Sequence, residues 1–403
     1  MTDAPSIPAP PRILHVITRL DRGGSTTNTL TSVRLQHNQQ FETALAYGVT
    51  QPSPDRIVAS LRAEGVACHF IPDLVREPVP WKDVAAFRAL LRLMRVERFD
   101  LVHTHTSKAG VLGRLAAARV GLPVVHTAHG HIFYGYFGPI LTRAFVLVER
   151  AMARSTARLV SLTDAETRES LERRIGRPEQ YVTIPSGVPL ACFRNLDPAL
   201  GAAFRARWTI PTDAVLVVSV GRLTAVKGFD RLLPAFAQTR FPDSSGFLAL
   251  VGDGEERPVL ERLAVSLGIR SRVVFTGDWD DVRPALAAAD FFALASRNEG
   301  MGRAIVEAMA AGLPVIAPAV GGVPEIIRHG ENGLVVPSGE PAVLAEALGT
   351  LAADPTRRRE MGRRAAEWVY PRFDEATMVD ALTTLYREVL SERDGVGAGK
   401  GRR

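Results

Sequence analysis

Short apolar runs alternate with longer segments of helical periodicity along the chain from Arg12 onward. Strands that alternate with helices are typical of βαβ units and of parallel sheets. In the first half the predicted strands are 13–18, 43–49, 66–71, 101–104, 124–128, 159–162 and 182–184. In the second half they are 215–220, 248–251, 273–276, 291–295 and 315–317. The pattern therefore predicts an α/β protein with two doubly wound parallel-sheet domains.

A break rich in Pro, Gly and Asp, SGVPLACFRNLDPALG, interrupts the pattern inside residues 185–211. We place the linker there, because turn-forming residues without periodicity mark connections between domains. In open parallel sheets, ligands bind beyond the carboxyl ends of the strands, so two facing units would share a site in a cleft. The expected parts are a flexible N-terminus 1–11, a first Rossmann-like domain 12–200, a second Rossmann-like domain 201–373, a helix 374–392 that crosses back to the first domain, and a disordered tail 393–403.

The composition excludes several classes of protein. A chain of 403 residues is long enough for two domains, and 46% hydrophobic with 23% charged residues is ordinary for a globular protein. The two cysteines, Cys68 and Cys192, cannot form a disulfide framework. The N-terminus lacks the pattern of a signal peptide, and no apolar run is long enough to span a membrane. These features predict a cytoplasmic protein.

The net charge of +6 favours a polyanionic partner, which could be a nucleic acid, an anionic lipid surface or a phosphorylated substrate. No zinc-finger spacing, RNP-type motif or basic run with interleaved aromatic residues is present. We therefore expect no nucleic-acid partner.

The sharpest local motif is GRLTAVKGFDRLL at residues 221–233. Gly221 ends a predicted strand, Arg222 follows it, and Gly228 after Lys227 leads into a predicted helix. Such a loop presents backbone N–H groups and the positive end of a helix dipole, and its two cations could clamp a diphosphate. The motif alone fits an exposed loop with ordinary surface charges equally well.

A second motif adds two carboxylates. Glu299 and Glu307 are eight residues apart, with the glycine-containing loop 300–302 between them and a predicted helix after it. A loop followed by a helix lets both carboxylates face one pocket, where they can accept hydrogen bonds from sugar and ribose hydroxyls. Glu307 could instead be a solvated helix residue, but its apolar neighbours within 305–309 favour a functional role.

Seven segments together carry a resemblance to a known family. They are RLDRGGS, VHTHTSKAGVLGRLAA (102–117), VVHTAHGHIF (124–133), VTIPSGV (182–188), GRLTAVKG (221–228), VGDGEER (251–257) and the E-x7-E span 299–307. In this order and at these distances, the chain resembles glycosyltransferase family 4, the retaining glycosyl transferases group 1, over almost all of its length. The resemblance implies the GT-B fold, in which two Rossmann-like domains face each other across a cleft. The domain 12–200 would then be the acceptor-side domain, and the domain 201–373 would bind the nucleotide sugar. It also implies an enzyme that transfers a hexosyl or N-acetylhexosaminyl group.

The resemblance assigns roles to the two motifs of the second half. Arg222 and Lys227 would hold the diphosphate of the donor, and Glu307 would bind its ribose. Glu299, with the amides of Met301 and Gly302, would hold hydroxyls of the transferred sugar.

In the first half the resemblance assigns two residues. Gly24, expected in the tight turn after the first strand, would let the backbone approach the donor phosphate or the acceptor. His129, at the end of the strand 124–128, would reach the sugar and line the reaction centre. The residues expected to act in catalysis are His129, Glu299, Arg222 and Lys227.

Histidines crowd two predicted strand ends; they are His103, His105, His126, His129 and His131. Their spacing would allow a zinc site, but no cysteine or convergent carboxylate joins them, and the family binds no metal there. We therefore expect no metal and interpret His103 and His126 as packed, hydrogen-bonded residues. The expected ligand is a nucleotide diphosphate sugar, and we expect the nucleotide to be UDP. We expect no tightly bound cofactor.

The resemblance favours a front-face substitution with retained configuration, because no carboxylate emerges as a nucleophile. The expected acceptor is a lipid-linked or polysaccharide precursor in glycan or cell-envelope biosynthesis. The run 25–28 departs from the small residue and acid of many relatives, so the acceptor contacts there stay open. Two alternatives also stay open: a nucleotide-sugar 2-epimerase with the same fold, and a non-catalytic nucleotide-sugar sensor.

The segment 137–158, FGPILTRAFVLVERAMARSTAR, distributes arginines among apolar residues. This pattern is typical of a helix that lies on an anionic membrane surface. A core-packed helix with one solvated side explains it equally well. The membrane interpretation predicts a peripheral protein at the inner face of the membrane.

Overall fold

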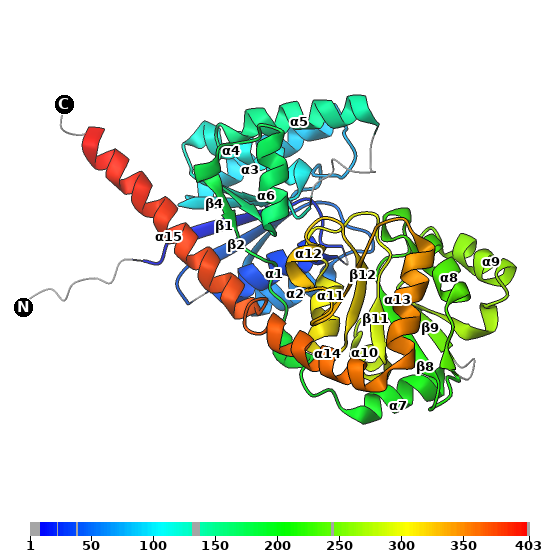
Figure 1. Cartoon of the computed structure of the whole chain (residues 1–403). Helices are drawn as coiled ribbons and strands as arrows, with labels where there is room; N and C mark the ends of the chain where they lie inside the picture. Colours follow the sequence, from blue (N-terminus) through cyan, green and yellow to red (C-terminus); the bar gives the residue numbers. More distant parts are fainter. Residues whose placement is uncertain (1–8, 22, 38, 131–137, 243–245, 401–403) are drawn as a thin grey trace, which may run out of the picture. The chain divides into compact units, whose positions relative to one another are not determined.

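The computed structural model describes residues 9–21, 23–37, 39–130, 138–242 and 246–400, with side chains through residue 393 (Figure 1). The chain forms two compact units. The first unit runs as far as Gly187 and resumes at Glu375, and the second extends from Val188 to Asp374. No helix within the described ranges is both long enough and apolar enough to cross a membrane.

The first unit contains a seven-stranded, all-parallel sheet with the order β3-β2-β1-β4-β5-β6-β7. Its strands are β1 (Arg12–Ile17), β2 (Glu42–Tyr47), β3 (Ala67–Phe70), β4 (Leu101–His105), β5 (Val124–Thr127), β6 (Arg158–Ser161) and β7 (Tyr181–Thr183). Each strand was predicted from an apolar run. Burial is nearly continuous along β1, β4 and β5 because helices cover both faces of a doubly wound sheet.

The helices of this unit are α1 (Gly24–Gln36), α2 (Asp55–Ala63), α3 (Pro80–Glu97), α4 (Ser107–Val120), α5 (Pro139–Ala153), α6 (Asp164–Glu172) and α15 (Glu375–Lys400). On one face of the sheet, α3 and α4 cover a core that includes Leu14 and Val102. On the other face, α15 contacts α1 and buries Tyr386 against Ile13 and Leu101. Helix α15, which is distant in sequence from the strands, therefore completes the hydrophobic core of the first unit.

The second unit contains a six-stranded parallel sheet with the order β10-β9-β8-β11-β12-β13. Its strands are β8 (Val215–Val220), β9 (Gly246–Val251), β10 (Val273–Gly277), β11 (Phe291–Ala293), β12 (Val315–Pro318) and β13 (Gly333–Val336). Its helices are α7 (Pro198–Arg207), α8 (Phe229–Gln238), α9 (Arg257–Ser266), α10 (Arg283–Ala288), α11 (Arg303–Ala310), α12 (Val323–Ile326), α13 (Pro341–Ala353) and α14 (Pro355–Val369). Strand β13 was not predicted, because its short apolar run after Gly333 is not separable from a loop by periodicity.

Two expected boundaries differ from the structure. The first unit ends at Gly187 rather than at 200, because α7 packs against α10 and so belongs to the second unit. The tail expected to be disordered from 393 continues as helix α15 through Lys400. Glycine lowers helix propensity by about 1 kcal/mol per residue, but a helix extended from a packed segment needs no new nucleation. Residues 1–8 of the expected flexible N-terminus lie outside the described residues.

Candidate functional site

The loop after β8 is shaped by close contact with the neighbouring strand end. It contains a short 3-10 turn, Ala225–Lys227, and Gly228 then adopts φ +67° before α8 begins. A Cβ atom at Gly228 would lie 2.0 Å from the carbonyl oxygen of Ala295, so only glycine fits there. This packing places Lys227 beside the loop that follows β11.

Lys227 and Glu299 form an ion pair across these two loops. The Nζ of Lys227 donates to Oε1 of Glu299 at 2.7 Å, and Oγ of Ser296 donates to the same oxygen at 2.7 Å. The Glu299 side chain is 7% exposed and the Lys227 side chain is 27% exposed. The sequence assigned these two residues to different parts of the donor, and the structure joins them directly. A charge-assisted contact of this kind fixes the ammonium in one place.

The motif VGDGEER supports the same loop from the other side. Gly252 adopts φ +138°, and a Cβ atom there would lie 2.1 Å from the carbonyl oxygen of Gly221. The backbone N–H of Leu223 donates to the carbonyl of Asp253 at 2.9 Å. The backbone around the exposed Arg222 is therefore held between β8 and the loop after β9.

An additional arginine, Arg297, ties the two loops together and was not predicted. Its backbone N–H donates to the carbonyl of Val226 at 2.8 Å. Its guanidinium forms two bonds to the carboxylate of Asp230, at 2.8 and 2.6 Å. The sequence signal that could have found it is a second cation directly before the Glu299 loop.

Glu307 lies on α11, which begins at Arg303 after Gly302. Burial raises the pKa of Glu307, and the nearby positive charge of Arg303 opposes that shift. The two side chains lie 3.7 Å apart and are 18% and 14% exposed. Met301 is 2% exposed, so its side chain belongs to the core and only its backbone can serve a ligand. Glu307 is therefore a half-buried carboxylate with a cationic neighbour rather than a solvated helix residue.

In the first unit, Gly24 is the first residue of α1 rather than part of a tight turn. Gly23 before it is extended, with φ −179°, so the chain enters the helix without a left-handed residue. The run 25–28 continues the helix, and the Nδ2 of buried Asn28 donates to Oγ of Ser186 at 2.9 Å. Asn28 therefore contributes to the packing of its unit.

His129 follows β5 after Ala128 and adopts φ +60°, which is unusual for a residue with a side chain. Its Nε2 lies 2.9 Å from Nδ1 of His105. Burial lowers the pKa of His129 to about 3. The ring is therefore neutral at ordinary pH and half-buried at the carboxyl end of the sheet.

His103 and His126 are packed and hydrogen-bonded, as expected from the sequence. His103 bonds to the hydroxyl of Tyr386 at 2.5 Å and to the hydroxyl of Thr127 at 2.8 Å, and His126 bonds to Thr104 at 2.9 Å. His131 lies outside the described residues. The contact of His15 with this group of histidines was not predicted, because its apolar neighbours in β1 are typical of an ordinary buried strand.

One histidine group could hold a metal ion. Each of His15, His103 and His105 offers a ring nitrogen, and these atoms lie within 4.8 Å of one another. In the structure, both ring nitrogens of His103 and of His105 already have hydrogen-bond partners. A cation would have to replace some of these bonds, and no carboxylate belongs to the group to balance its charge.

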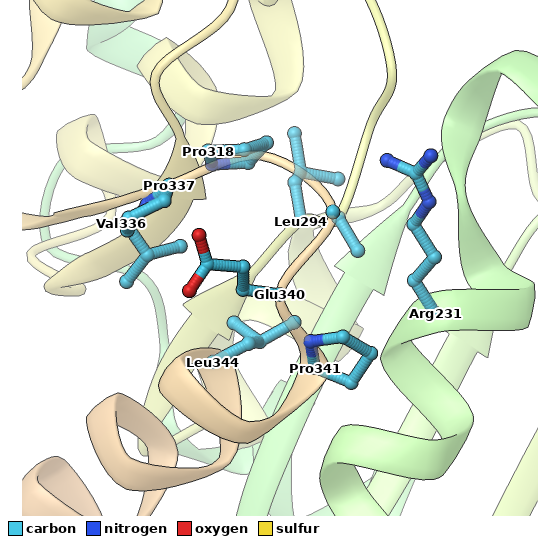
Figure 2. Close-up of a pocket in the computed structure, with 10 residues that line it drawn as sticks. Arg231, Leu294, Pro318, Val336, Pro337, Glu340, Pro341 and Leu344 are labelled. Carbon is cyan, nitrogen blue, oxygen red and sulfur yellow. The ribbon is translucent and has the colours of Figure 1, made fainter.

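Figure 2 shows a separate small pocket of the second unit, where β11, β12 and β13 end. Its lining is mainly apolar, with Arg231 and Glu340 as its charged members. None of the residues expected to bind the donor lines it. We therefore assign it no part in the site.

Two parallel Rossmann-like sheets, with a cation-bearing loop and a buried carboxylate at the strand ends of the second, match the GT-B fold of glycosyltransferases. The family described as "Glycosyl transferases group 1" matches residues 202–368, and the "Glycosyl transferase 4-like domain" matches residues 11–187. The chain belongs to this family of glycosyltransferases, family 4.

Relatives and solved structures agree with this assignment. A "D-inositol 3-phosphate glycosyltransferase" of Saccharomonospora viridis is 33% identical over 365 residues, covering 84% of this chain and 83% of the relative. The Escherichia coli "UDP-Gal:alpha-D-GlcNAc-diphosphoundecaprenol alpha-1,3-galactosyltransferase" is 28% identical over 386 residues, covering 94% and 97%. The structure titled "Anabaena Alr3699/HepE in complex with UDP and glucose" has a TM-score of 0.82 at 23% identity, covering 94% and 99%.

Proposed function

We propose that this enzyme transfers a hexose or N-acetylhexosamine from a UDP-sugar to a lipid-linked or polysaccharide precursor, with retention of the anomeric configuration. The observation that carries the proposal is the Lys227–Glu299 pair, held between the loops that follow β8 and β11. A fixed cation can bind a diphosphate, and a carboxylate can accept a hydrogen bond from a sugar hydroxyl, so the pair supports the proposal.

In this proposal Arg222 and Lys227 stabilise the negative charge that develops on the departing diphosphate. Charges fixed in advance stabilise a transition state without a reorganisation cost. Glu307 accepts hydrogen bonds from the ribose, and Glu299 with the amides of Met301 and Gly302 holds the sugar. On the first unit, Gly24 is assigned a contact with the donor phosphate or the acceptor, and His129 a contact with the transferred sugar.

Relatives support the choice of donor and the class of acceptor. Two solved structures of similar fold carry UDP or UDP-glucose according to their titles. One relative is named as a galactosyltransferase acting on a diphosphoundecaprenol-linked sugar, and another as a lipopolysaccharide core glycosyltransferase. These names favour a UDP-sugar and an envelope glycan precursor for this chain.

The test is a thermal-shift screen of UDP, GDP, ADP and their sugars, since a ligand that binds only the folded state raises the midpoint. UDP and one UDP-sugar are expected to give the largest shifts, and a larger shift with GDP or ADP would overturn the donor assignment. Proton NMR of the product with a matched acceptor then reports its anomeric configuration. Incubation with the UDP-sugar alone separates a transferase from a 2-epimerase, because only the epimerase yields a new nucleotide sugar.

Association with an anionic membrane is a second part of the proposal, and the exposed face of α5 favours it. Ile140, Leu141, Leu147 and Val148 are 84%, 47%, 61% and 40% exposed, and only Ala153 of this helix is buried. Arg143 and Arg154 are exposed on or just beyond the same helix. An apolar stripe flanked by arginines suits the boundary between lipid headgroups and acyl chains.

The matched test compares Leu147→Glu on α5 with Val265→Glu on α9, since both wild-type side chains are about equally exposed, at 61% and 62%. Sedimentation with anionic liposomes at physiological salt is expected to fall for the first variant and stay unchanged for the second. Equal binding of the wild-type protein to neutral and anionic liposomes would refute this part of the proposal.

A further inference from the structure

Three histidines of the first unit form a hydrogen-bonded chain that leads to the proposed reaction centre. Nδ1 of His15, on β1, lies 3.1 Å from Nε2 of His105, on β4. Nδ1 of His105 lies 2.9 Å from Nε2 of His129, after β5. His15 and His105 are fully buried, whereas His129 is half-buried. The chain therefore connects the interior of the sheet with its carboxyl edge.

The free end of this chain sets the direction of its hydrogen bonds. Burial lowers the pKa of all three rings, so each ring is neutral and has one donor and one acceptor nitrogen. Nε2 of His15 is buried and has no hydrogen-bond partner within the described part of the chain. A buried N–H without an acceptor is costly, and orphaned donors are rarer than unfilled acceptors. The proton of His15 therefore belongs on Nδ1.

The remaining protons follow from this one. Nδ1–H of His15 donates to Nε2 of His105, which places the proton of His105 on Nδ1. That N–H in turn donates to Nε2 of His129, which places the proton of His129 on Nδ1.

We propose that His15 and His105 are positioning residues that hold His129 as its Nδ1–H tautomer, so that this N–H can donate to an oxygen of the transferred sugar. The assignment of the sugar as the acceptor of that bond rests on the proposed function. The backbone of His129 supports the proposal independently, because left-handed non-glycine residues persist where surrounding contacts hold them and concentrate at functional sites.

The side-chain amides of Asn and Gln offer a test at His105. Asn places an amide near the position of Nδ1, which faces His129, and Gln places it near Nε2, which faces His15. His105→Asn is therefore expected to keep a donor to His129, and His105→Gln to lose it. His126→Gln is the matched control, because His126 is equally buried on the neighbouring strand but bonds to Thr104 instead.

The direct readout is the tautomer of His129, from long-range proton–nitrogen correlation spectra of the full chain labelled in its imidazole nitrogens. The wild-type protein, His105→Asn and His126→Gln are expected to show Nδ1–H, and His105→Gln is expected to show Nε2–H. In turnover with a UDP-sugar, His105→Gln is expected to lower kcat by about 10- to 100-fold, the range found when the partners that orient metal-bound histidines are removed. KM should change much less, and His105→Asn should restore most of kcat.

Three results would overturn the proposal: Nε2–H at His129 in the wild-type protein, an unchanged tautomer in His105→Gln, or stoichiometric zinc in the purified protein that is lost in His15→Gln. The tautomer of His129 can be measured on the wild-type protein alone, so this test depends neither on the folding of a variant nor on a known substrate. Failure of the donor screen alongside the expected spectra would therefore count against the proposed function and leave the histidine chain standing.

Discussion

The Lys227–Glu299 pair makes a quantitative prediction about the second unit. Glu299 is nearly buried. Removal of Lys227 leaves its carboxylate with the hydroxyl of Ser296 as its remaining hydrogen-bond donor among the side chains that the structure describes. Fully buried pairs lose about 3–5 kcal/mol when one partner is removed, and exposed pairs contribute about 0.2–1 kcal/mol. Because Lys227 is 27% exposed, we expect an intermediate coupling energy of about 1–3 kcal/mol.

A double-mutant cycle with Lys227→Met and Glu299→Gln measures this coupling. Three of the four tryptophans, Trp208, Trp279 and Trp368, lie in the second unit, so tryptophan fluorescence during urea unfolding reports mainly on it. A Trp81→Phe background removes the signal of the first unit.

The pair between Arg297 and Asp230 is the matched control. It joins the loop after β11 to the first turn of α8, and its side chains are 36% and 41% exposed, so its coupling is expected to stay below about 1 kcal/mol. If the two cycles gave the same coupling energy, the reasoning from burial would be refuted.

Two further predictions concern ligand affinity and pH. Glu307→Ala is expected to weaken binding of UDP, whereas Glu299→Ala is expected to spare UDP and impair sugar transfer; calorimetric titration showing equal loss of affinity would contradict this division. Burial lowers the pKa of His15 to about 3, below the ordinary 6.5, so the unfolded chain takes up the proton first. Its contribution to stability is complete above pH 6.5 and is lost as the pH falls toward 3, by up to about 1.4 kcal/mol per pH unit. Urea unfolding between pH 7 and 5 should be less pH-dependent in His15→Gln, and an identical slope would show that His15 does not titrate on unfolding.

The class of fold and most of the strands could be predicted from local sequence patterns. The apolar runs of β1 and β8 could be recognised because each strand of a doubly wound sheet is buried on both faces. The loop chemistry of Arg222 and Lys227 was also local, since strand, cations and glycine follow one another within a few residues.

Which side chains come into contact could not be predicted from local patterns, because it depends on how distant strands pair. Lys227 and Glu299 are 72 positions apart, and their contact depends on β8 lying beside β11. His15 reaches the other histidines because the register pairs it with His103 across β1 and β4. Strand order and register depend on long-range packing, and a one-residue shift would turn His15 to the opposite face of the sheet. Local patterns therefore named the residues of the site, whereas their partners followed from pairings between distant segments.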